Sequence, residues 1–156
     1  MQLTRIVVRD DQPTVQHVEV QHQFRAPVER VFARYNDHVS WGSWSGLGRV
    51  RLAREGVPAP NGVGCVREFR TAGAKVQEEV LSYEPPHRMT YRLIRGPVPM
   101  ADHLGEAVFE SCDGGTLVTW RCRFRSRIPG LGGLQRLMIT RLFRNALRGL
   151  ERDLGA

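Results

Sequence analysis

The segment LGGLQRLMITRLFRNALRGLERDL, residues 131–154, decides the fold of this chain. Gly132 and Gly133 loosen its start, and from residue 139 onward its apolar side chains recur every three or four positions. This is the period of one face of an α-helix, so the segment predicts a long amphipathic helix. Such a wide stripe needs a large apolar surface to pack against. The stripe comprises Ile139, Leu142, Phe143, Ala146, Leu147, Leu150 and Leu154.

Short alternating segments before this helix supply the surface. In residues 116–125, apolar Val118, Trp120, Cys122 and Phe124 alternate with polar residues, which is the period of a half-buried strand. Further strands are predicted at residues 15–24, 48–55, 64–71, 75–83, 89–93 and 104–111. Most of the connections are short turns, which favours an antiparallel sheet. Residues 25–37 and 38–48, between the first two strands, predict two short helical pieces. The expected class is therefore α+β.

The length of 156 residues predicts a single domain over residues 1–156. Residues 1–14 are expected to be an N-terminal tail or to add an edge strand at residues 6–8. No apolar run approaches 18 residues, so we expect no transmembrane helix. The first residues lack the apolar core of a signal peptide, which predicts a cytoplasmic protein. Lys75 is the only lysine against 22 arginines, a bias typical of a GC-rich bacterial genome.

The net charge of +7 is concentrated in the last part of the chain. Residues 121–156 hold nine arginines and two acidic residues, so the first 120 residues sum to zero. No recognised nucleic-acid motif accompanies this charge, so we expect no nucleic-acid partner. The arginines form a solvated outer surface, or they contact an acidic partner or an anionic membrane peripherally. The expected oligomeric state stays open between a monomer and a homodimer.

The sequence lacks the recognised signatures of a cofactor or metal enzyme. There is no nucleophile elbow, no paired-histidine zinc motif and no phosphate-binding glycine loop. Cys65, Cys112 and Cys122 are widely spaced and form no zinc-ligand pattern, so they are expected to be reduced thiols. We therefore predict no metal and no cofactor.

Several phrases, in this order, resemble a known family. They are FRAPVERVFARYND at 24–37, WGSWSGL at 41–47, GVGCVREF at 62–69, EEVLSYEPPHRMTYRL at 78–93 and DGGTLVTWRCRF at 113–124. Together they resemble the SRPBCC or START-like superfamily, and within it the polyketide cyclase/dehydrase branch, over residues 15–154. The resemblance implies a helix-grip fold, in which a curved seven-stranded antiparallel sheet wraps a long C-terminal helix. Two short helices lie between strands 1 and 2. Members bind lipids, hormones or polyketides in a cavity between sheet and helix.

Strand alternation and helix spacing predict which side chains would line such a cavity. The alternative is that they pack as a dry core. Two tryptophans of the loop after the first helix would close one end, and the other side chains come from the strands and the last helix. The predicted ligand-binding set is Trp41, Trp44, Phe69, Val80, Tyr91, Leu93, Phe109, Trp120, Cys122, Phe124, Met138, Phe143 and Leu147.

Three polar residues are candidates to anchor a ligand or to act in catalysis. Arg67 and Glu78 have the parity of inward residues on two strands joined by a hairpin, so they could form a buried pair. Arg67 could hold a carboxylate or an enolate. His103 lies near the predicted cavity mouth and could act as a general base. His38 is a second candidate base, although such a loop histidine is more often at the surface.

Three functions remain open from the sequence. The first is binding of a hydrophobic small molecule in the cavity. The second is a cofactor-independent polyketide cyclase or aromatase that uses acid and base residues of the cavity wall. The third is an interaction module that uses the basic C-terminal face, through Arg123, Arg125 and Arg148. In the last helix, Leu134, Leu137 and Met138 point away from the stripe, so its first half is expected to line the cavity mouth or meet a second subunit.

Overall fold

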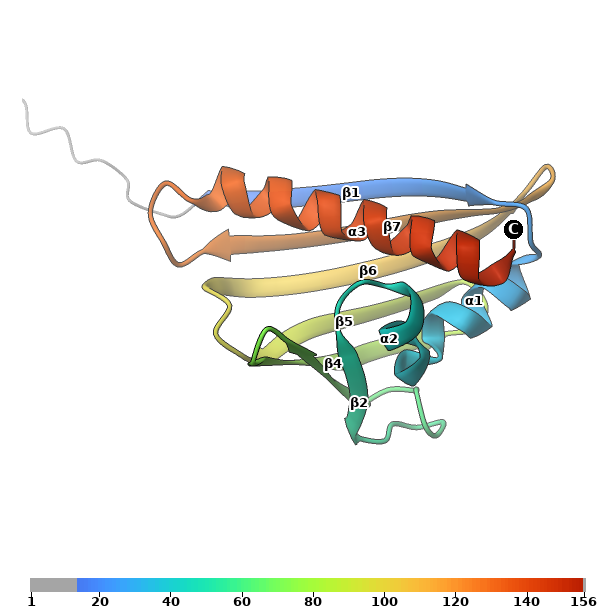
Figure 1. Cartoon of the computed structure of the whole chain (residues 1–156), viewed down its shortest axis with the longest axis horizontal. Coiled ribbons are helices and arrows are strands. Elements are labelled where there is room, and N and C mark those ends of the chain that lie inside the picture. The colour runs from blue at the N-terminus through green and yellow to red at the C-terminus, as the bar shows by residue number, and fades with distance from the viewer. Residues whose placement is uncertain (1–13, 156) are drawn as a thin grey trace, which may run out of the picture.

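The computed structural model describes residues 14–155 (Figure 1). The predicted extra strand at residues 6–8 lies outside this range. The elements follow in the order expected from the sequence: β1 (Val15–Phe24), α1 (Val28–Asn36), the 3-10 helix η1 (His38–Ser40), α2 (Trp41–Trp44), β2 (Arg49–Arg54), β3 (Val66–Thr71), β4 (Ala74–Glu84), β5 (Arg88–Arg95), β6 (Met100–Cys112), β7 (Gly115–Ser126) and α3 (Gly132–Leu154).

The seven strands form one antiparallel sheet in the order β1-β7-β6-β5-β4-β3-β2. Strands β2 to β7 are joined in sequence as neighbours, and β1 closes the other edge by pairing with β7 along its whole length. Helix α3 runs along the inner face of the sheet over β1 and β7, while α1, η1 and α2 cover one end (Figure 1). The expected α+β helix-grip fold is therefore confirmed.

Helix α3 begins at Gly132, seven residues before its regular apolar stripe. The backbone N–H of Gln135 donates to the Leu131 carbonyl at 3.0 Å. The Gln135 side chain is buried, and its Nε2 donates to the Pro99 carbonyl at 3.4 Å. The first turn of the helix is therefore held by a local backbone bond and by one contact with the β5–β6 loop. The helix ends at Gly155, which adopts the left-handed conformation that favours glycine.

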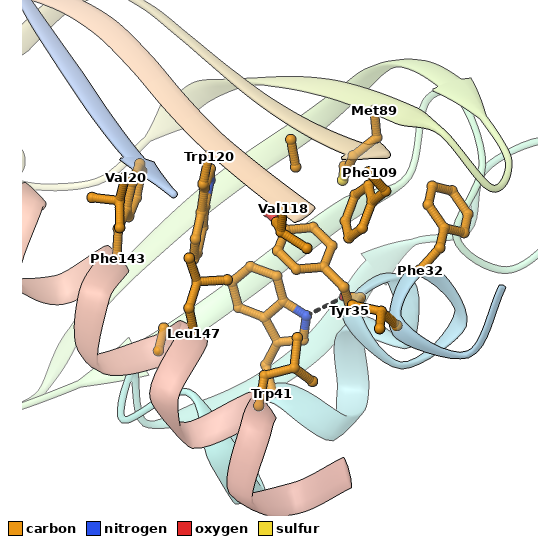
Figure 2. Close-up of a cluster of buried hydrophobic side chains, with 14 of the residues drawn as sticks. Val20, Phe32, Tyr35, Trp41, Met89, Phe109, Val118, Trp120, Phe143 and Leu147 are labelled. Carbon is orange, nitrogen blue, oxygen red and sulfur yellow. Dashed lines mark hydrogen bonds between the residues drawn. The ribbon is translucent and has the colours of Figure 1, made fainter. Parts of the chain in front are cut away.

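Aromatic rings fill the core between the short helices and the sheet (Figure 2). Tyr35, Trp41 and Trp120 meet edge to face, with the Tyr35 and Trp41 centroids 5.0 Å apart and the Trp41 and Trp120 centroids 5.6 Å apart. The indole Nε1 of Trp41 donates to the Tyr35 carbonyl at 2.6 Å, which satisfies its buried polar atom. The two short helices are thus part of the core.

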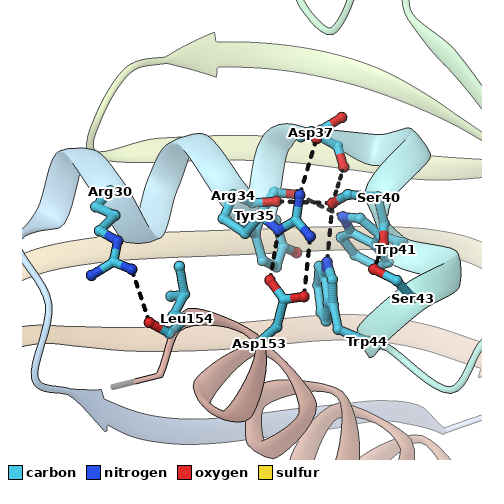
Figure 3. A network of polar contacts seen from close by, with 10 residues as sticks. All are labelled: Arg30, Arg34, Tyr35, Asp37, Ser40, Trp41, Ser43, Trp44, Asp153 and Leu154. Carbon is cyan, nitrogen blue, oxygen red and sulfur yellow. Dashed lines mark hydrogen bonds and ion pairs between the residues drawn. The ribbon is translucent and has the colours of Figure 1, made fainter.

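Polar contacts fix the C-terminal end of α3 to α1 (Figure 3). The Arg34 guanidinium donates to both carboxylate oxygens of Asp153, at 2.7 and 3.1 Å. Arg30 donates to the Leu154 carbonyl at 2.9 Å. The last turns of α3 are therefore clamped, as expected for the half of the helix that carries the stripe. None of the helices in the described range is long and apolar enough to cross a membrane.

Candidate functional site

A cleft of about 280 Å³ lies between the inner face of the sheet and α3. Its wall is mainly aromatic and aliphatic, with a few charged or polar groups, which is the usual character of a small-molecule site. A larger hollow of about 490 Å³ lies on the outer face among Arg92, Arg123 and Arg125, but it lacks this apolar wall. Nine of the residues predicted from the sequence line the inner cleft: Trp41, Arg67, Phe69, Glu78, Tyr91, Leu93, His103, Trp120 and Phe143.

The other predicted lining residues lie elsewhere. The cleft occupies only one end of the inner face, because α1 and α2 fill the other end. Phe109, for example, packs there against Phe32 and Tyr35, with centroids 5.2 Å from each. Strand alternation predicts which residues face inward, but it does not predict which end of the inner face holds the cleft. Trp44, Val80, Phe109, Cys122, Phe124 and Leu147 are buried in the core, and Met138 is 62% exposed on α3.

Part of the wall was not predicted as ligand-binding. Leu47, Val98 and Met100 come from connections or from the extension of β6, where no periodic signal marks a lining residue. Ile139 and Leu142 belong to the helix stripe, but spacing alone does not separate the cleft from the core. Thr71 and Val76 complete the wall at the β3–β4 hairpin.

One polar row crosses this apolar wall. Arg67 on β3 is directly opposite Glu78 on β4, and Glu78 is opposite Leu93 on β5. His103 on β6 continues the row, because its Nδ1 accepts a hydrogen bond from the Leu93 backbone N–H at 3.0 Å. Paired residues of neighbouring strands share a face of the sheet, so the row brings the three predicted polar candidates to one wall.

Arg67 is fully buried within aromatic rings. Its guanidinium carbon lies 4.5 Å from the Trp41 ring centroid and 4.4 Å from that of Tyr91, which are cation–π distances. Its Nε donates to Glu78 Oε2 at 2.8 Å, and Nη2 lies 2.8 Å from the same oxygen as an ion-pair contact without hydrogen-bond geometry. Burial lowers the pKa of Arg67, but the Glu78 carboxylate together with Tyr35 and Tyr91 outweighs this effect and leaves that pKa raised. The Nη1 nitrogen has no protein partner.

Tyr35 lies behind this row and is not among the site residues predicted from the sequence. Its hydroxyl is buried and has no hydrogen-bond partner in the described structure. Burial raises the pKa of Tyr35, and the nearby Arg67 charge partly opposes this shift. The sequence offers no signal for it, because its spacing is that of an ordinary helix core position.

His103 lies where the sheet separates. Strands β5 and β6 pair only from Arg88 to Tyr91 on β5, and the last pair is Tyr91 with Gly105. Beyond it the two strands diverge toward the end where α3 begins (Figure 1). The backbone N–H of Leu93 is always a donor, so Nδ1 of His103 must be unprotonated and the neutral ring carries its proton on Nε2.

Two chemical properties of His103 follow from this contact. Burial lowers its pKa, which favours the neutral ring. The protonated Nε2 can donate a hydrogen bond but cannot accept a proton, and a proton on Nδ1 would oppose the Leu93 N–H. The geometry thus favours His103 as a hydrogen-bond donor and disfavours the general base considered from the sequence.

His38 is not a surface residue, contrary to the sequence-based expectation. It is fully buried beneath the short helices, and its Nδ1 lies 3.6 Å from the Cys65 thiol. Burial lowers the pKa of His38 well below its usual value and raises that of Cys65. Cys65, Cys112 and Cys122 are free thiols. Within residues 14–155 no group of three or more His, Cys, Asp or Glu side chains is placed to hold a metal ion.

The positive charge of the C-terminal part is divided between two sides. Arg123 and Arg125 alternate with the inward residues of β7, so they stand on the outer face of the sheet. Arg148 lies on the exposed side of α3, which covers the inner face. The three arginines considered for one basic face therefore point to different sides of the molecule.

A curved antiparallel sheet, a long C-terminal helix laid across it and an apolar cleft between them define a START-like helix-grip domain. Residues 15–155 match the family described as polyketide cyclase / dehydrase and lipid transport, and the chain belongs to this family.

Several solved structures share this fold. A START superfamily protein from Mycobacterium smegmatis superimposes with a TM-score of 0.75 at 10% identity, over 88% of this chain and 95% of that one. A protein from Thermobifida fusca gives 0.75 at 19% identity, over 89% and 93% of the chains. DynU16, from the dynemicin biosynthetic locus, gives 0.69 at 19% identity, over 90% of this chain and 47% of its own. These likenesses show the fold alone. No curated protein matches the chain.

Proposed function

We propose that this protein binds a hydrophobic small molecule in the cleft, with an acidic or carbonyl oxygen of the ligand held by Arg67. The observation that carries the proposal is the buried guanidinium, whose Nη1 has no protein partner on the wall of an apolar cleft. An unsatisfied buried donor is costly, about 1–3 kcal/mol, and a ligand oxygen would remove that cost.

The size of the cleft constrains the ligand. About 280 Å³ lies just below the usual range for ligand sites, which is roughly 300–1,000 Å³. The rings of Trp41, Tyr91 and Trp120 line it. These features favour a flat ligand of one or two rings, or a short chain, over a lipid with two acyl chains.

The same row of residues supports a polyketide cyclase as the second candidate. Arg67 and the donor Nε2 of His103 could stabilise the enolate of a poly-β-ketone, since both groups offer N–H donors to a developing negative charge. Glu78 is then the remaining candidate base on the wall, and it is engaged by Arg67. This weakens the catalytic reading relative to binding.

Native mass spectrometry of freshly purified protein tests the proposal. We expect a copurified lipophilic molecule, or a rise in melting temperature with small aromatic carboxylic acids that exceeds the rise with their neutral amides. Arg67→Met should abolish the preference for the acid, while Arg123→Met on the outer face should keep it. Equal stabilisation by acids and amides in the unaltered protein would contradict the role of Arg67. Turnover of a poly-β-ketone that is lost in Glu78→Gln would instead support the cyclase.

A further inference from the structure

Exposed apolar side chains gather at the start of α3. Eleven large hydrophobic residues are exposed in the part of the chain that the structure describes, and six of them fall within residues 128–142. A stretch so short should not collect half of them by chance, because exposed apolar residues are normally scattered singly. The six are Ile128, Leu131, Leu134, Leu137, Met138 and Leu142, with 40%, 37%, 54%, 47%, 62% and 37% of each residue exposed.

Four of these residues form a second stripe, which starts at the residue before α3 and meets the stripe that packs on the sheet at Leu142. Leu131, Leu134, Met138 and Leu142 follow one another at three- and four-residue steps, which places them on one line of the helix. Leu142 also lines the cleft. The second stripe therefore runs from the start of the helix to the edge of the cleft.

The charge around this stripe has one sign. Arg127, Arg136 and Arg141 are exposed within the same segment, and residues 114–150 contain no Asp or Glu. The β5–β6 loop lies against this segment, since the Arg127 N–H donates to the Pro99 carbonyl at 2.8 Å. Residues 94–101, which comprise this loop and the strand ends beside it, add Arg95 and also contain no acidic residue. Asp102, which follows this range, forms an ion pair with Arg125 at 3.7 Å.

We propose that this surface docks on a bilayer that contains anionic lipid. We define the docking surface as Leu131, Leu134, Met138 and Leu142 together with Arg127 and Arg141. Leucine and methionine side chains would enter the acyl boundary, and the arginines would meet the phosphates, as in amphipathic helices that lie in the membrane interface.

The charge pattern favours a bilayer over a second copy of the chain. A two-fold interface brings the same patch of both copies together, so arginines would face arginines with no acid in the segment to pair with them. An anionic bilayer supplies the missing negative charge and the apolar layer at once. Docking would place the edge of the cleft at the membrane, where a lipophilic ligand could pass without crossing water. Only this last step rests on the proposed function.

Co-sedimentation of the full chain with lipid vesicles tests the docking, without any added ligand. We expect binding to vesicles of phosphatidylglycerol and phosphatidylcholine in equal parts, and no binding to phosphatidylcholine alone. Each arginine near an anionic surface strengthens binding roughly fivefold, so Arg127→Gln with Arg141→Gln should weaken it about 25-fold. Leu134→Gln with Met138→Gln should abolish it. Both pairs are exposed, and circular dichroism checks that they fold.

The matched control is Arg25→Gln with Arg123→Gln, which removes the same charge from exposed sites away from this surface. This control should weaken binding only marginally, and high salt should release the unaltered protein. The proposal is overturned if the unaltered protein does not bind the anionic vesicles, or if the control pair loses as much binding as Arg127→Gln with Arg141→Gln. It is also overturned if sedimentation shows a dimer that Leu134→Gln with Met138→Gln dissociates, since the surface would then join two copies. Binding to poly-glutamate without binding to vesicles would assign the surface to an acidic protein instead.

Discussion

The indole ring of Trp120 lies flat against the ring of Phe143, with the centroids 3.9 Å apart and the planes 5° apart. Trp120 belongs to β7 and Phe143 to α3, so this stack joins the sheet to the helix. The indole Nε1 also donates to the Tyr91 hydroxyl at 2.7 Å, which fixes its orientation. Both rings line the cleft, so the contact that holds the two layers together also shapes the candidate site.

Phe143→Ala should lower the free energy of unfolding by about 3–5 kcal/mol, because it leaves a cavity between sheet and helix. Phe143→Leu should cost less, about 1–2 kcal/mol, since it keeps most of the volume but loses the aromatic stack. Urea unfolding followed by circular dichroism measures both. Leu137→Ala, at an exposed position of the same helix, serves as the control and should change stability by under about 0.5 kcal/mol. Equal losses for Phe143→Ala and Leu137→Ala would contradict the role of the stack.

Two glycines of α3 should respond oppositely to alanine. Gly149 is buried, and a Cβ there would overlap the carbonyl oxygen of Trp44 on α2. Gly149→Ala should therefore destabilise the protein by about 1–3 kcal/mol, although alanine is the better helix former. Gly133 meets open space, so Gly133→Ala should stabilise the helix by up to about 1 kcal/mol. Thermal unfolding of the two variants checks the signs, and a stabilised Gly149→Ala would show that α2 and α3 are not in close contact.

The two members of the Arg67–Glu78 pair should not be equally costly to remove. Glu78→Gln leaves the fully buried guanidinium without its counter-charge, which should cost about 3 kcal/mol of stability. Arg67→Met replaces the buried charge by an apolar chain, so it should cost clearly less. Denaturant unfolding of both variants side by side measures the difference. A larger loss for Arg67→Met would mean that the aromatic contacts of the guanidinium outweigh the ion pair.

The hydrogen bond between His103 and the Leu93 N–H can be tested independently of the imidazole ring. In His103→Asn, the side-chain oxygen can accept the Leu93 N–H near the position of Nδ1, while His103→Leu leaves that N–H without a partner. We therefore expect His103→Leu to be less stable than His103→Asn by about 1–3 kcal/mol. Amide exchange at Leu93, followed by NMR, should be faster in the leucine variant only. Indistinguishable exchange rates in both variants would show that the hydrogen bond does not protect this amide.

Stability should fall as the pH drops below the usual histidine pKa of 6.5. The pKa values of buried His38 and His103 are lowered in the folded chain. Between 6.5 and those lowered values the unfolded chain binds more protons than the folded one, so the free energy of unfolding decreases as pH falls through this window. Above about pH 7 both states are neutral at these positions and the contribution is constant. Urea unfolding across this pH range should show a shallower slope for His103→Asn, and an unchanged slope would contradict the assignment.

Alternation and helix spacing predicted most of the fold. Strand β7 was predicted over residues 116–125 and spans Gly115–Ser126, because apolar and polar residues alternate along it, although Thr119 of the polar set is also buried. The regular apolar stripe begins only at residue 139, whereas α3 begins at Gly132. Its first turn is held by a local backbone bond and a contact with Pro99 and not by the stripe, and a single-sequence pattern does not report such contacts.

The candidate site was predictable only in part. Hairpin parity brought Arg67 and Glu78 to one wall, and the structure places them opposite each other. The position of His103 depends instead on a bulge between Ala101 and Leu104, with Asp102 at a positive φ of 52°. Irregularities of this kind shift the register without leaving a periodic trace. The burial of His38 likewise follows from how the short helices cap the sheet.

Strands β5 and β6 share a backbone ladder at one end of the sheet only, and at the other end they are separate. Residues 92–95 of β5 and residues 100–104 of β6 do not pair through their backbones. The Leu93 N–H instead donates to the His103 ring. Strands without a shared ladder can move apart at little energetic cost. Leu93 and His103 both line the cleft, so we expect its width on this side to depend on the hydrogen bond between them.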